Sequence, residues 1–379
     1  MSTLTAPFDP AWSSRLGGVL TMTTLVQVTG PDIEPITLDV VSGSVTWAED
    51  AAPHVAAGLT CHIPDSLAAL DALDPRLNRR LVVTAGYRVP GASESHVVAD
   101  LMLTERIVKR GDGTAQMEIR GVSDEQRVLD TQPINASRTF NESSDGGRAI
   151  ADLITWGISG SPSSDAPIEV TASGTFVPAG DSLLIDREDD LWQAVQDIAD
   201  RIGAWVYHDG LGAFHVVPQP INAGSATAML GVGNGGTVTA SEAALTREAF
   251  ANTVVVQYRW YDGDSRFAQG YAEVTSGSLA VAAVGRKVIK VPIERKGTAA
   301  QAKAAARQML TRAISRGRSL SIEYAHAPLW VRPGQTVTVG LVTGPQERHL
   351  VSRVDLDIPS GKGHITTRQP ENVVIETGE

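Results

Sequence analysis

The sequence predicts a mainly β protein with an α+β part, arranged as two antiparallel β-barrels separated by a small α+β domain. Hydrophobic and polar residues alternate with a period of two near both ends of the chain, which is typical of strands that are buried on one side. A helical stripe followed by a hairpin pattern occupies the middle. We expect domains at residues 1–128, 129–238 and 239–379, and 379 residues agree with two or three domains of about 150 residues each.

The first segment, 1–128, contains several alternating runs with turn residues between them, which favours a barrel or a sandwich. Gly111-Asp112-Gly113 separates the last two runs and predicts a tight hairpin. Arg110-Gly111-Asp112 also spells a cell-adhesion tripeptide, but the hairpin explains the same residues. The positions expected to share a face within each run are Leu20, Met22, Thr24, Val26 and Val28, then Val97, Ala99, Leu101 and Leu103, then Ala115, Met117 and Ile119.

The middle segment, 129–238, has a helical pattern over 190–202 and a weaker one over 145–156. The apolar stripe of the 190–202 helix repeats at spacings of four, three and four residues, and Gly203 stands where a C-terminal cap belongs. We expect a hairpin over 204–217, closed by Asp209-Gly210, and a loose linker over 221–240. The stripe consists of Leu191, Val195, Ile198 and Ile202.

The last segment, 239–379, returns to alternating strands and contains one helix, predicted over 299–316. Thr298 and Gln301 form a capping-box pattern at its start, and Gly317 can end it. The helix would face the core with Ala302, Ala306, Met309, Leu310 and Ala313. The strand faces are Val254, Val256, Tyr258 and Trp260; Leu320, Ile322 and Tyr324; Val337, Val339 and Leu341; and Leu350, Val354, Leu356 and Ile358.

The net charge is −11 and is unevenly distributed. Residues 1–250 hold 15 basic and 32 acidic side chains, a net −17, whereas residues 251–379 hold 17 and 11, a net +6. The acidic majority argues against general binding of duplex DNA, which requires cations to neutralise phosphates. Opposed signs suit a polar assembly whose two ends meet different partners, but ordinary scatter between domains explains them equally well.

Neither a membrane-spanning apolar run nor a secretory signal is apparent in the sequence. The single cysteine, Cys61, excludes an intrachain disulfide framework, and its alternation with Leu59 and Ile63 predicts a buried strand position.

Several patterns could carry chemistry, but each has a simpler structural interpretation. Gly231, Gly233 and Gly236 match the spacing of a dinucleotide fingerprint, yet they lie in the Gly-rich linker and lack a convincing βαβ context. His208 and His215 could face each other across the hairpin and, with Asp209, hold zinc; exposed polar surface is the simpler interpretation. The seven tryptophans are scattered, which favours core or interface roles over a sugar-stacking platform. They are Trp12, Trp47, Trp156, Trp192, Trp205, Trp260 and Trp330.

The acidic run before the 190–202 helix could form a paired-carboxylate site like that of a glycosidase. A helix N-terminus, where the dipole favours anions, explains the run without chemistry. Its members are Asp186, Glu188, Asp189 and Asp190. We assign no catalytic, cofactor-binding or metal-ligating residue and expect no cofactor.

The segment 190–217 resembles the helix–hairpin of the hub proteins at the tail tips of bacteriophages and of related contractile injection machines. It reads DLWQAVQDIADRIGAWVYHDGLGAFHV, in which a W-x-x-I-x-x-I-A-x-x-x-G type helix runs into two strands joined by a D-x-x-G turn. Asn252–Gln257 is similar to the strand that opens the second barrel in that family. The closing stretch from Pro333 to Arg368 is similar to the family's final barrel hairpins, and Val45-Thr-Trp47 fits a first barrel.

The resemblance implies a structural virion protein rather than an enzyme. It implies a homotrimer in which three chains contribute six barrels and adapt a six-fold tail tube to a three-fold tip. The expected partners are the distal tail protein, the tail tube proteins, the tape measure protein and other minor tail or receptor-binding proteins. DNA would pass through the channel without specific binding, and an acidic wall would repel its phosphates.

The resemblance implies a position at the tail tip of the virion, after synthesis in the bacterial host cytoplasm. Two alternatives remain open at this stage: a peripheral tail protein that binds host glycans through exposed aromatic residues, and a tail-tip glycosidase that uses the acids of 186–190.

Overall fold

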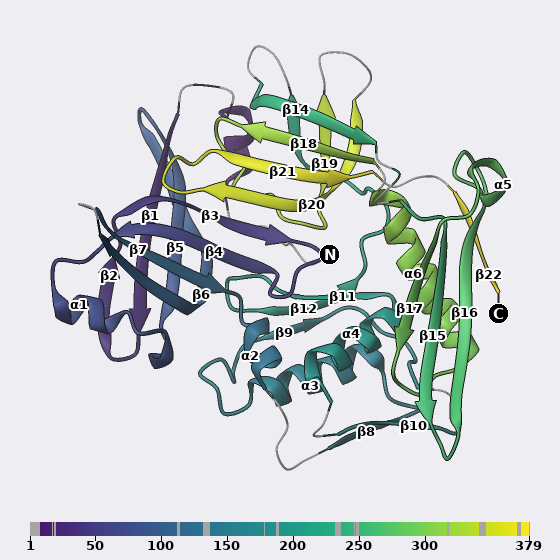
Figure 1. Cartoon of the computed structure of the whole chain (residues 1–379). Coiled ribbons are helices and arrows are strands. Elements are labelled where there is room, and N and C mark those ends of the chain that lie inside the picture. Colours follow the sequence, from purple (N-terminus) through teal and green to yellow (C-terminus); the bar gives the residue numbers. More distant parts are fainter. Residues whose placement is uncertain are drawn as a thin grey trace.

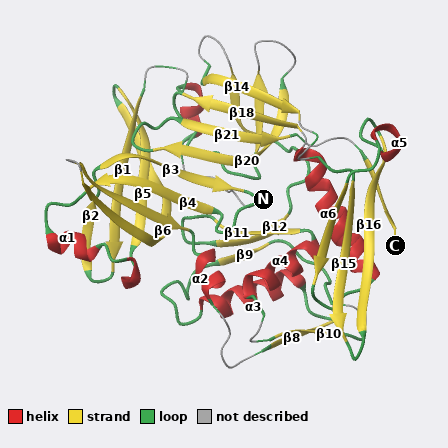
Figure 2. Ribbon diagram, in the orientation of Figure 1, coloured by secondary structure: helices red, strands yellow, loops and turns green. Residues whose placement is uncertain are grey.

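The computed structural model describes residues 8–16, 18, 20–111, 114–131, 137–177, 179–186, 189–231, 236–245, 247, 250–316, 318–340, 346–369 and 373–378. The protein has three parts: a large curved sheet, a small α+β unit beneath it, and a four-stranded sheet covered by one long helix (Figure 1). Strands predominate (Figure 2), so the expected mainly β class is confirmed. Within the described ranges, no helix is long and apolar enough to cross a membrane.

The large sheet has 13 strands, drawn from both ends of the chain. Its order is β14-β18-β21-β20-β3-β4-β7-β6-β5-β1-β2, and β19 pairs with β20 on one side and β13 on the other. The first group consists of β1 (Thr21–Gly30), β2 (Ile33–Thr37), β3 (Val40–Ala48), β4 (Val55–His62), β5 (Arg80–Val89), β6 (Ala92–Gly111) and β7 (Thr114–Val122). The second consists of β13 (Ala226–Gly231), β14 (Val238–Leu245), β18 (Arg318–Tyr324), β19 (Thr336–Gly340), β20 (Glu347–Asp357) and β21 (Gly363–Arg368).

The two groups join where β3 pairs antiparallel with β20. This pairing runs from Arg353 opposite Ala48 to Asp357 opposite Ser44. The side chains of Val45 and Trp47 point into the same core as Val354, so both groups share one hydrophobic cluster. The predicted closed barrels are not found among the described strands, because this pairing merges the two halves into one open sheet. The boundaries at residues 128 and 238 stay predictions.

A β-bulge corrects one predicted core position. The register of β5 with β6 shifts between Val83 and Thr84, so that Val98 is fully buried and Val97 is 41% exposed. Alternation beyond the bulge returns Ala99 and Leu101 to the core, as predicted. The Asp112-Gly113 turn lies outside the described residues.

The α+β unit forms the second layer. It contains α2 (Glu125–Asp130), α3 (Gly146–Ile158), α4 (Leu191–Ile202), β8 (Arg138–Asn141), β9 (Ile168–Val170), β10 (Ser182–Ile185), β11 (Ala204–His208) and β12 (Phe214–Pro218). The predicted helix and hairpin are both confirmed. Asp190 caps α4 by accepting a hydrogen bond from the N–H of Gln193 (2.9 Å), and Gly203 ends it with φ at 68°. Apolar residues of α3, α4 and the hairpin share a second core.

The four-stranded sheet forms the third layer, in the order β17-β15-β16-β22. The strands are β15 (Thr253–Tyr261), β16 (Ser265–Ser276), β17 (Val288–Ile293) and β22 (Val374–Gly378), accompanied by α5 (Val281–Val284) and α6 (Ala299–Arg316). Val254, Val256 and Tyr258 of β15 pack against the alanine stripe of α6. The strand that was expected to open the second barrel therefore lies in a separate sheet, since α6 covers its apolar face.

The predicted capping box of α6 is confirmed. The N–H of Thr298 donates to Oε1 of Gln301 (3.0 Å), and the N–H of Gln301 donates to Oγ1 of Thr298 (3.3 Å). Gly317 lies outside the described residues. The remaining short helices are η1 (Pro10–Ser14), α1 (Leu67–Ala72) and η2 (Pro75–Leu77).

Close contact between α6 and β16 depends on Gly270. A Cβ at this position would lie 2.5 Å from the backbone nitrogen of Lys303, nearer than real Cβ atoms come to their neighbours. We expect Gly270→Ala to lower the free energy of unfolding by about 1–3 kcal/mol, because the helix must shift off the sheet. Urea denaturation measures the change.

Gly58→Ala provides the matched control, since a Cβ there meets nothing within 4 Å. It should alter stability by no more than about 0.5–1 kcal/mol. Equal destabilisation by the two substitutions would contradict the assigned packing of α6.

Candidate functional site

The hairpin histidines do not form a metal site. The register of β11 and β12 pairs Tyr207 with His215 and His208 with Phe214, so the two imidazoles lie on opposite faces. The His215 ring stacks on Tyr207 with centroids 5.0 Å apart, and its Nε2 lies 3.4 Å from Oδ2 of Asp209. The prediction that the two histidines face each other was wrong, because His215 pairs with Tyr207, one residue before His208. Among the residues described, no group of three or more His, Cys, Asp or Glu side chains could hold a metal ion.

The acidic run before α4 stabilises local structure. Oδ2 of Asp189 accepts a hydrogen bond from the N–H of Asp186 (2.8 Å), and Oδ1 of Asp189 lies 3.3 Å from Nη2 of Arg295. Asp190 is the helix cap described above. These contacts use the carboxylates for capping and for contact with the four-stranded layer. Glu188 lies outside the described residues.

The tryptophans do not form an exposed row. Trp12, Trp47, Trp192, Trp205 and Trp330 are all at most 7% exposed. The two others are partly buried: Trp156 carries the guanidinium of Arg138 over its ring, at 4.9 Å, and Trp260 packs on the α6 core.

Cys61 is fully buried in β4, as its alternation predicted, and burial raises the pKa of its thiol to about 12. The glycine fingerprint also lacks its required context. Gly231 ends β13, and residues 238–245 form a strand where a dinucleotide site would need a helix. Gly233 lies outside the described residues.

One constellation that sequence reasoning missed has the order of a nucleophile, a base and an orienting acid. Oγ of Ser321 lies 2.6 Å from Nε2 of His364, and Nδ1 of His364 lies 3.6 Å from Oδ2 of Asp355. The three residues come from neighbouring strands and are far apart in sequence, so no short motif could show them.

The geometry around this constellation argues against catalysis. Asp355 is already held by Arg353, whose Nη2 lies 2.7 Å from Oδ1, and by the hydroxyl of Thr46 (2.5 Å). The strand N–H groups around the serine take part in sheet pairing, whereas an oxyanion site needs donors that are kept free. We therefore interpret the constellation as part of a polar sheet surface.

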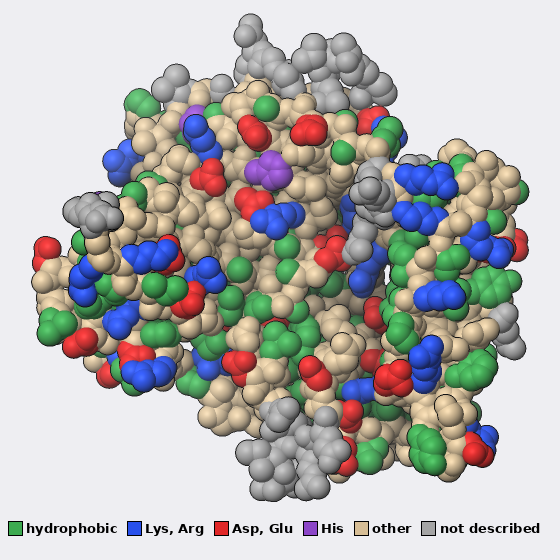
Figure 3. Space-filling view, viewed as in Figure 1, with side chains coloured by type: hydrophobic (Ala, Val, Ile, Leu, Met, Phe, Trp, Pro, Cys, Tyr) green, Lys and Arg blue, Asp and Glu red, His purple; other side chains and the backbone are tan. Residues whose placement is uncertain are grey.

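That surface is the face of the large sheet opposite its core. It spans β14, β18, β21, β20, β3, β4, β7 and the paired part of β6, and small residues such as Ser44, Thr60 and Thr366 recur on it. In Figure 3 the surface over β14, β18, β21 and β20 is mostly tan, with scattered charged side chains. The charged residues of this polar face include Glu105, Glu118, Glu242, Glu323, Asp355 and Asp357, with Lys109, Arg120, Arg348 and Arg353.

Carboxylates exceed cations on the polar face. Three of the cations named above are paired with a carboxylate of the same face: Lys109 with Glu118, Arg120 with Glu105 at 3.2 Å, and Arg353 with Asp355 at 2.7 Å. The named carboxylates outnumber the named cations, so this face is net negative.

Two buried polar networks fix the α+β unit to the large sheet. In the first, Arg368 donates from Nε (2.9 Å) and Nη2 (2.8 Å) to the carboxylate of Glu49, and the Nη2 group also donates to the carbonyl of Pro220 (2.7 Å). The side-chain amide of Gln219 donates to Oε1 of Glu49 (2.8 Å), and the indole N–H of Trp205 donates to the backbone carbonyl of Glu49 (3.2 Å).

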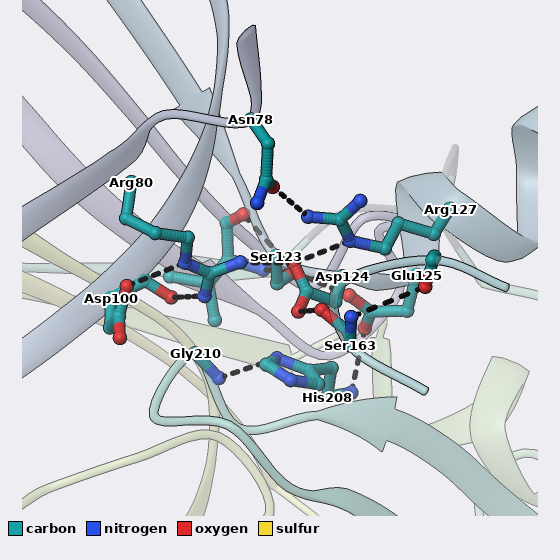
Figure 4. A network of polar contacts seen from close by, with 12 residues as sticks. Asn78, Arg80, Asp100, Ser123, Asp124, Glu125, Arg127, Ser163, His208 and Gly210 are labelled. Carbon is teal, nitrogen blue, oxygen red and sulfur yellow. Dashed lines mark hydrogen bonds and ion pairs between the residues drawn. The ribbon is translucent and has the colours of Figure 1, made fainter. Parts of the chain in front are cut away.

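The second network surrounds Asp124 and Glu125 at the start of α2 (Figure 4). Arg80 donates to Oδ1 of Asp124 (2.6 Å) and to Oδ1 of Asp100 (2.8 Å). Ser163 donates to the other oxygen of Asp124 (2.6 Å). The Asp100 N–H also donates to the carbonyl of Gly210 (2.6 Å), so the hairpin tip is bonded to β6. No sequence pattern marked these residues, because their partners come from distant segments.

No protein-family model matches the chain, and no curated protein matches it. Solved structures do. The tail protein from Neisseria meningitidis MC58 is similar with a TM-score of 0.64 at 14% identity, covering 93% of this chain and 97% of that one. The 43 kDa tail protein of prophage MuSo2 from Shewanella oneidensis is similar with a TM-score of 0.63 at 13% identity, and the match covers 93% of this chain and 100% of that one.

Prophage tail protein gp18 from Listeria monocytogenes EGD-e gives a TM-score of 0.50 at 12% identity, covering 92% of this chain and 95% of that one. The chain thus has the fold of phage and prophage tail proteins over most of its length, which confirms the resemblance seen in the sequence.

The Glu49–Arg368 pair provides a test of the junction. Both side chains are buried, so Arg368→Met would leave a carboxylate without its cation. We expect a loss of about 3–5 kcal/mol in the free energy of unfolding, measured by chemical denaturation.

Arg353→Met is the matched control, because its pair with Asp355 leaves the arginine half exposed. Surface pairs contribute at most about 1 kcal/mol. A loss of that small size at Arg368 as well would refute the structural role of the buried pair.

Proposed function

We propose that this protein is a structural hub of a bacteriophage tail tip. Three copies would surround the DNA channel and adapt the hexameric tail tube to three-fold symmetry. The distal tail protein, tail tube proteins, tape measure protein and other minor tail or receptor-binding proteins are the proposed neighbours. The tail-protein fold over most of the chain supports the placement in a tail.

The observation that carries the proposal is the large sheet itself. One chain supplies two groups of strands, β1–β7 and β13, β14 and β18–β21, and each group is a candidate tube-like unit. Three chains would then supply six such units, which is the number a six-fold tube needs. We propose that the polar face lines the channel, because small polar residues and net negative charge favour sliding of DNA over adhesion.

The number of copies in each virion tests the hub directly. We expect three copies per tail when purified particles are analysed by quantitative mass spectrometry against the tail tube protein. Electron-microscope averages of the tip should show three-fold symmetry next to a six-fold tube. Six copies, one copy, or a location along the shaft would reject the proposal.

The channel role of the polar face predicts an effect of charge reversal. Glu242→Lys combined with Glu323→Lys should leave the tail assembled but slow DNA release, because the new cations would bind DNA phosphates. Each such contact steepens the slope of log affinity against log salt by about 0.9, so the release rate should recover at high salt. Glu294→Lys on the exposed surface of the four-stranded layer is the control; an equal effect there would count against a channel-lining face.

A peripheral glycan-binding role is the alternative, and one observation favours it. Tyr261 and Phe267 are 79% and 63% exposed near the tip of the β15–β16 hairpin and lie on the same side of the sheet. Glycan-array binding that disappears in Tyr261→Ala would favour this alternative over the hub.

A further inference from the structure

One of the groups that join the α+β unit to the large sheet is a buried carboxyl group that accepts hydrogen bonds from both. Glu125, at the first position of α2, is 1% exposed. Its Oε1 accepts hydrogen bonds from the backbone N–H of His54 (3.2 Å) and of His208 (2.8 Å), and its Oε2 is bonded to the hydroxyl of Ser123. These partners belong to the β3–β4 connection, the end of β11 and the segment after β7, so three separate segments meet at one side chain (Figure 4).

The cations around Glu125 are engaged elsewhere. Arg80 and Arg127 lie 2.6 Å and 3.6 Å from Oδ1 of the adjacent Asp124, and Arg80 also pairs with Asp100. Arg332, whose charge acts on His54, donates to the carbonyls of Leu329 (2.7 Å) and Val331 (2.9 Å). The ion pairs found within the described ranges do not include Glu125.

The other titratable neighbours do not supply a positive charge either. Burial lowers the pKa of His54 to about 3 and also lowers that of His208, so both imidazoles are neutral at physiological pH. Asp209 and Asp124 both have a lowered pKa and are negative. None of these groups supplies a positive charge, and burial disfavours the ionised form of Glu125.

The N–H groups that donate to Glu125 lower its pKa, but burial outweighs them, and the hydrogen bonds can also accommodate a neutral carboxylic acid. Oγ of Ser123 accepts the N–H of Val55 (3.0 Å) and lies 3.2 Å from the carbonyl oxygen of Val55. When Glu125 is protonated, its Oε2–H can donate to Ser123 Oγ while the serine hydroxyl donates to Val55. When Glu125 loses the proton, the serine hydroxyl must turn to the carboxylate and abandon the Val55 carbonyl.

We propose that Glu125 is a proton-controlled latch, which holds the β11–β12 hairpin against the large sheet when it is protonated and loosens that junction when it ionises. The inference stands whether or not the protein is a tail hub, since it depends only on contacts within one chain. The opened junction would let water reach the carboxylate and would free the hairpin tip from β6.

The direction of the pH effect follows from linkage. Burial raises the pKa of Glu125 from 4.5 to about 7, whereas a solvated carboxyl in the open junction has an ordinary pKa. The closed junction thus binds the proton more tightly. Its extra stability is fully present below about pH 4.5, falls as pH rises, and is lost above about pH 7. The difference between the pKa of Glu125 in the closed junction and in the open junction allows the equilibrium constant for opening to rise by up to about 300-fold.

Hydrogen–deuterium exchange of the full chain between pH 5 and 8.5, corrected for intrinsic rates, tests the latch. In the wild type, amides of the peptides around 52–56 and 205–211 should lose protection at least tenfold as pH rises from 5 to about 7, and the loss should level off above that pH. Glu125→Gln mimics the protonated form, because its carbonyl can accept both N–H groups and its amide can donate to Ser123. This variant should stay protected at every pH.

Glu118→Gln, on the polar face, is the matched control and should behave as the wild type does. The proposal is overturned if protection in the wild type does not change with pH. It is also overturned if Glu125→Gln loses protection as the wild type does. If Glu125→Gln does not fold, infrared spectroscopy of the wild type decides. A buried protonated carboxylic acid gives a C=O band that should disappear near pH 7 as exchange rises, and its absence at pH 5.5 would also refute the latch.

Discussion

The pairing of β3 with β20 is the contact on which the rest of the molecule depends. It joins residues separated by about 300 positions in the chain; the hydroxyl of Thr46 and the carboxylate of Asp355, for example, are 309 residues apart. Closing so long a loop costs conformational entropy, which burial must offset. Trp47 supplies much of that burial: it is 1% exposed, and the guanidinium of Arg332 lies over its ring at 4.4 Å. The α+β unit and all of the four-stranded layer except β22 lie in sequence between the two paired strands, so this ladder constrains where both can sit.

Buried polar groups connect the α+β unit to the sheet. The unit has a hydrophobic core of its own, separate from that of the large sheet. The connection is made by Glu49 with Arg368, by Asp124 with Arg80, and by Glu125 with backbone N–H groups. Buried charges and carboxyl groups tolerate few arrangements, because any unpaired partner carries a large desolvation cost. Such a junction fixes the geometry closely, and it also responds to any change in protonation.

The residue types that suggest catalysis serve structure in this chain. The acids before α4 cap the helix or hold Arg295, and His215 stacks on Tyr207. Ser321, His364 and Asp355 lie on a sheet whose backbone donors are already paired. A reactive site needs donors kept free for a transition state. These side chains take part in structural contacts, and the chain has the fold of solved tail proteins.

The sequence by itself determined the elements whose causes are local. The helix over 190–202, its Asp190 and Gly203 caps, the 204–217 hairpin and the Thr298–Gln301 capping box all follow from residues a few positions apart, and all are present. Tertiary structure alone decided the rest. It merged the expected barrels through β3 and β20, and it placed β15 under α6 in a separate sheet. It also turned His208 away from His215, and it gathered Glu125, His54 and His208 at one point. These outcomes depend on which distant strands pair and in which register, and a shift of one residue reverses the face of every side chain.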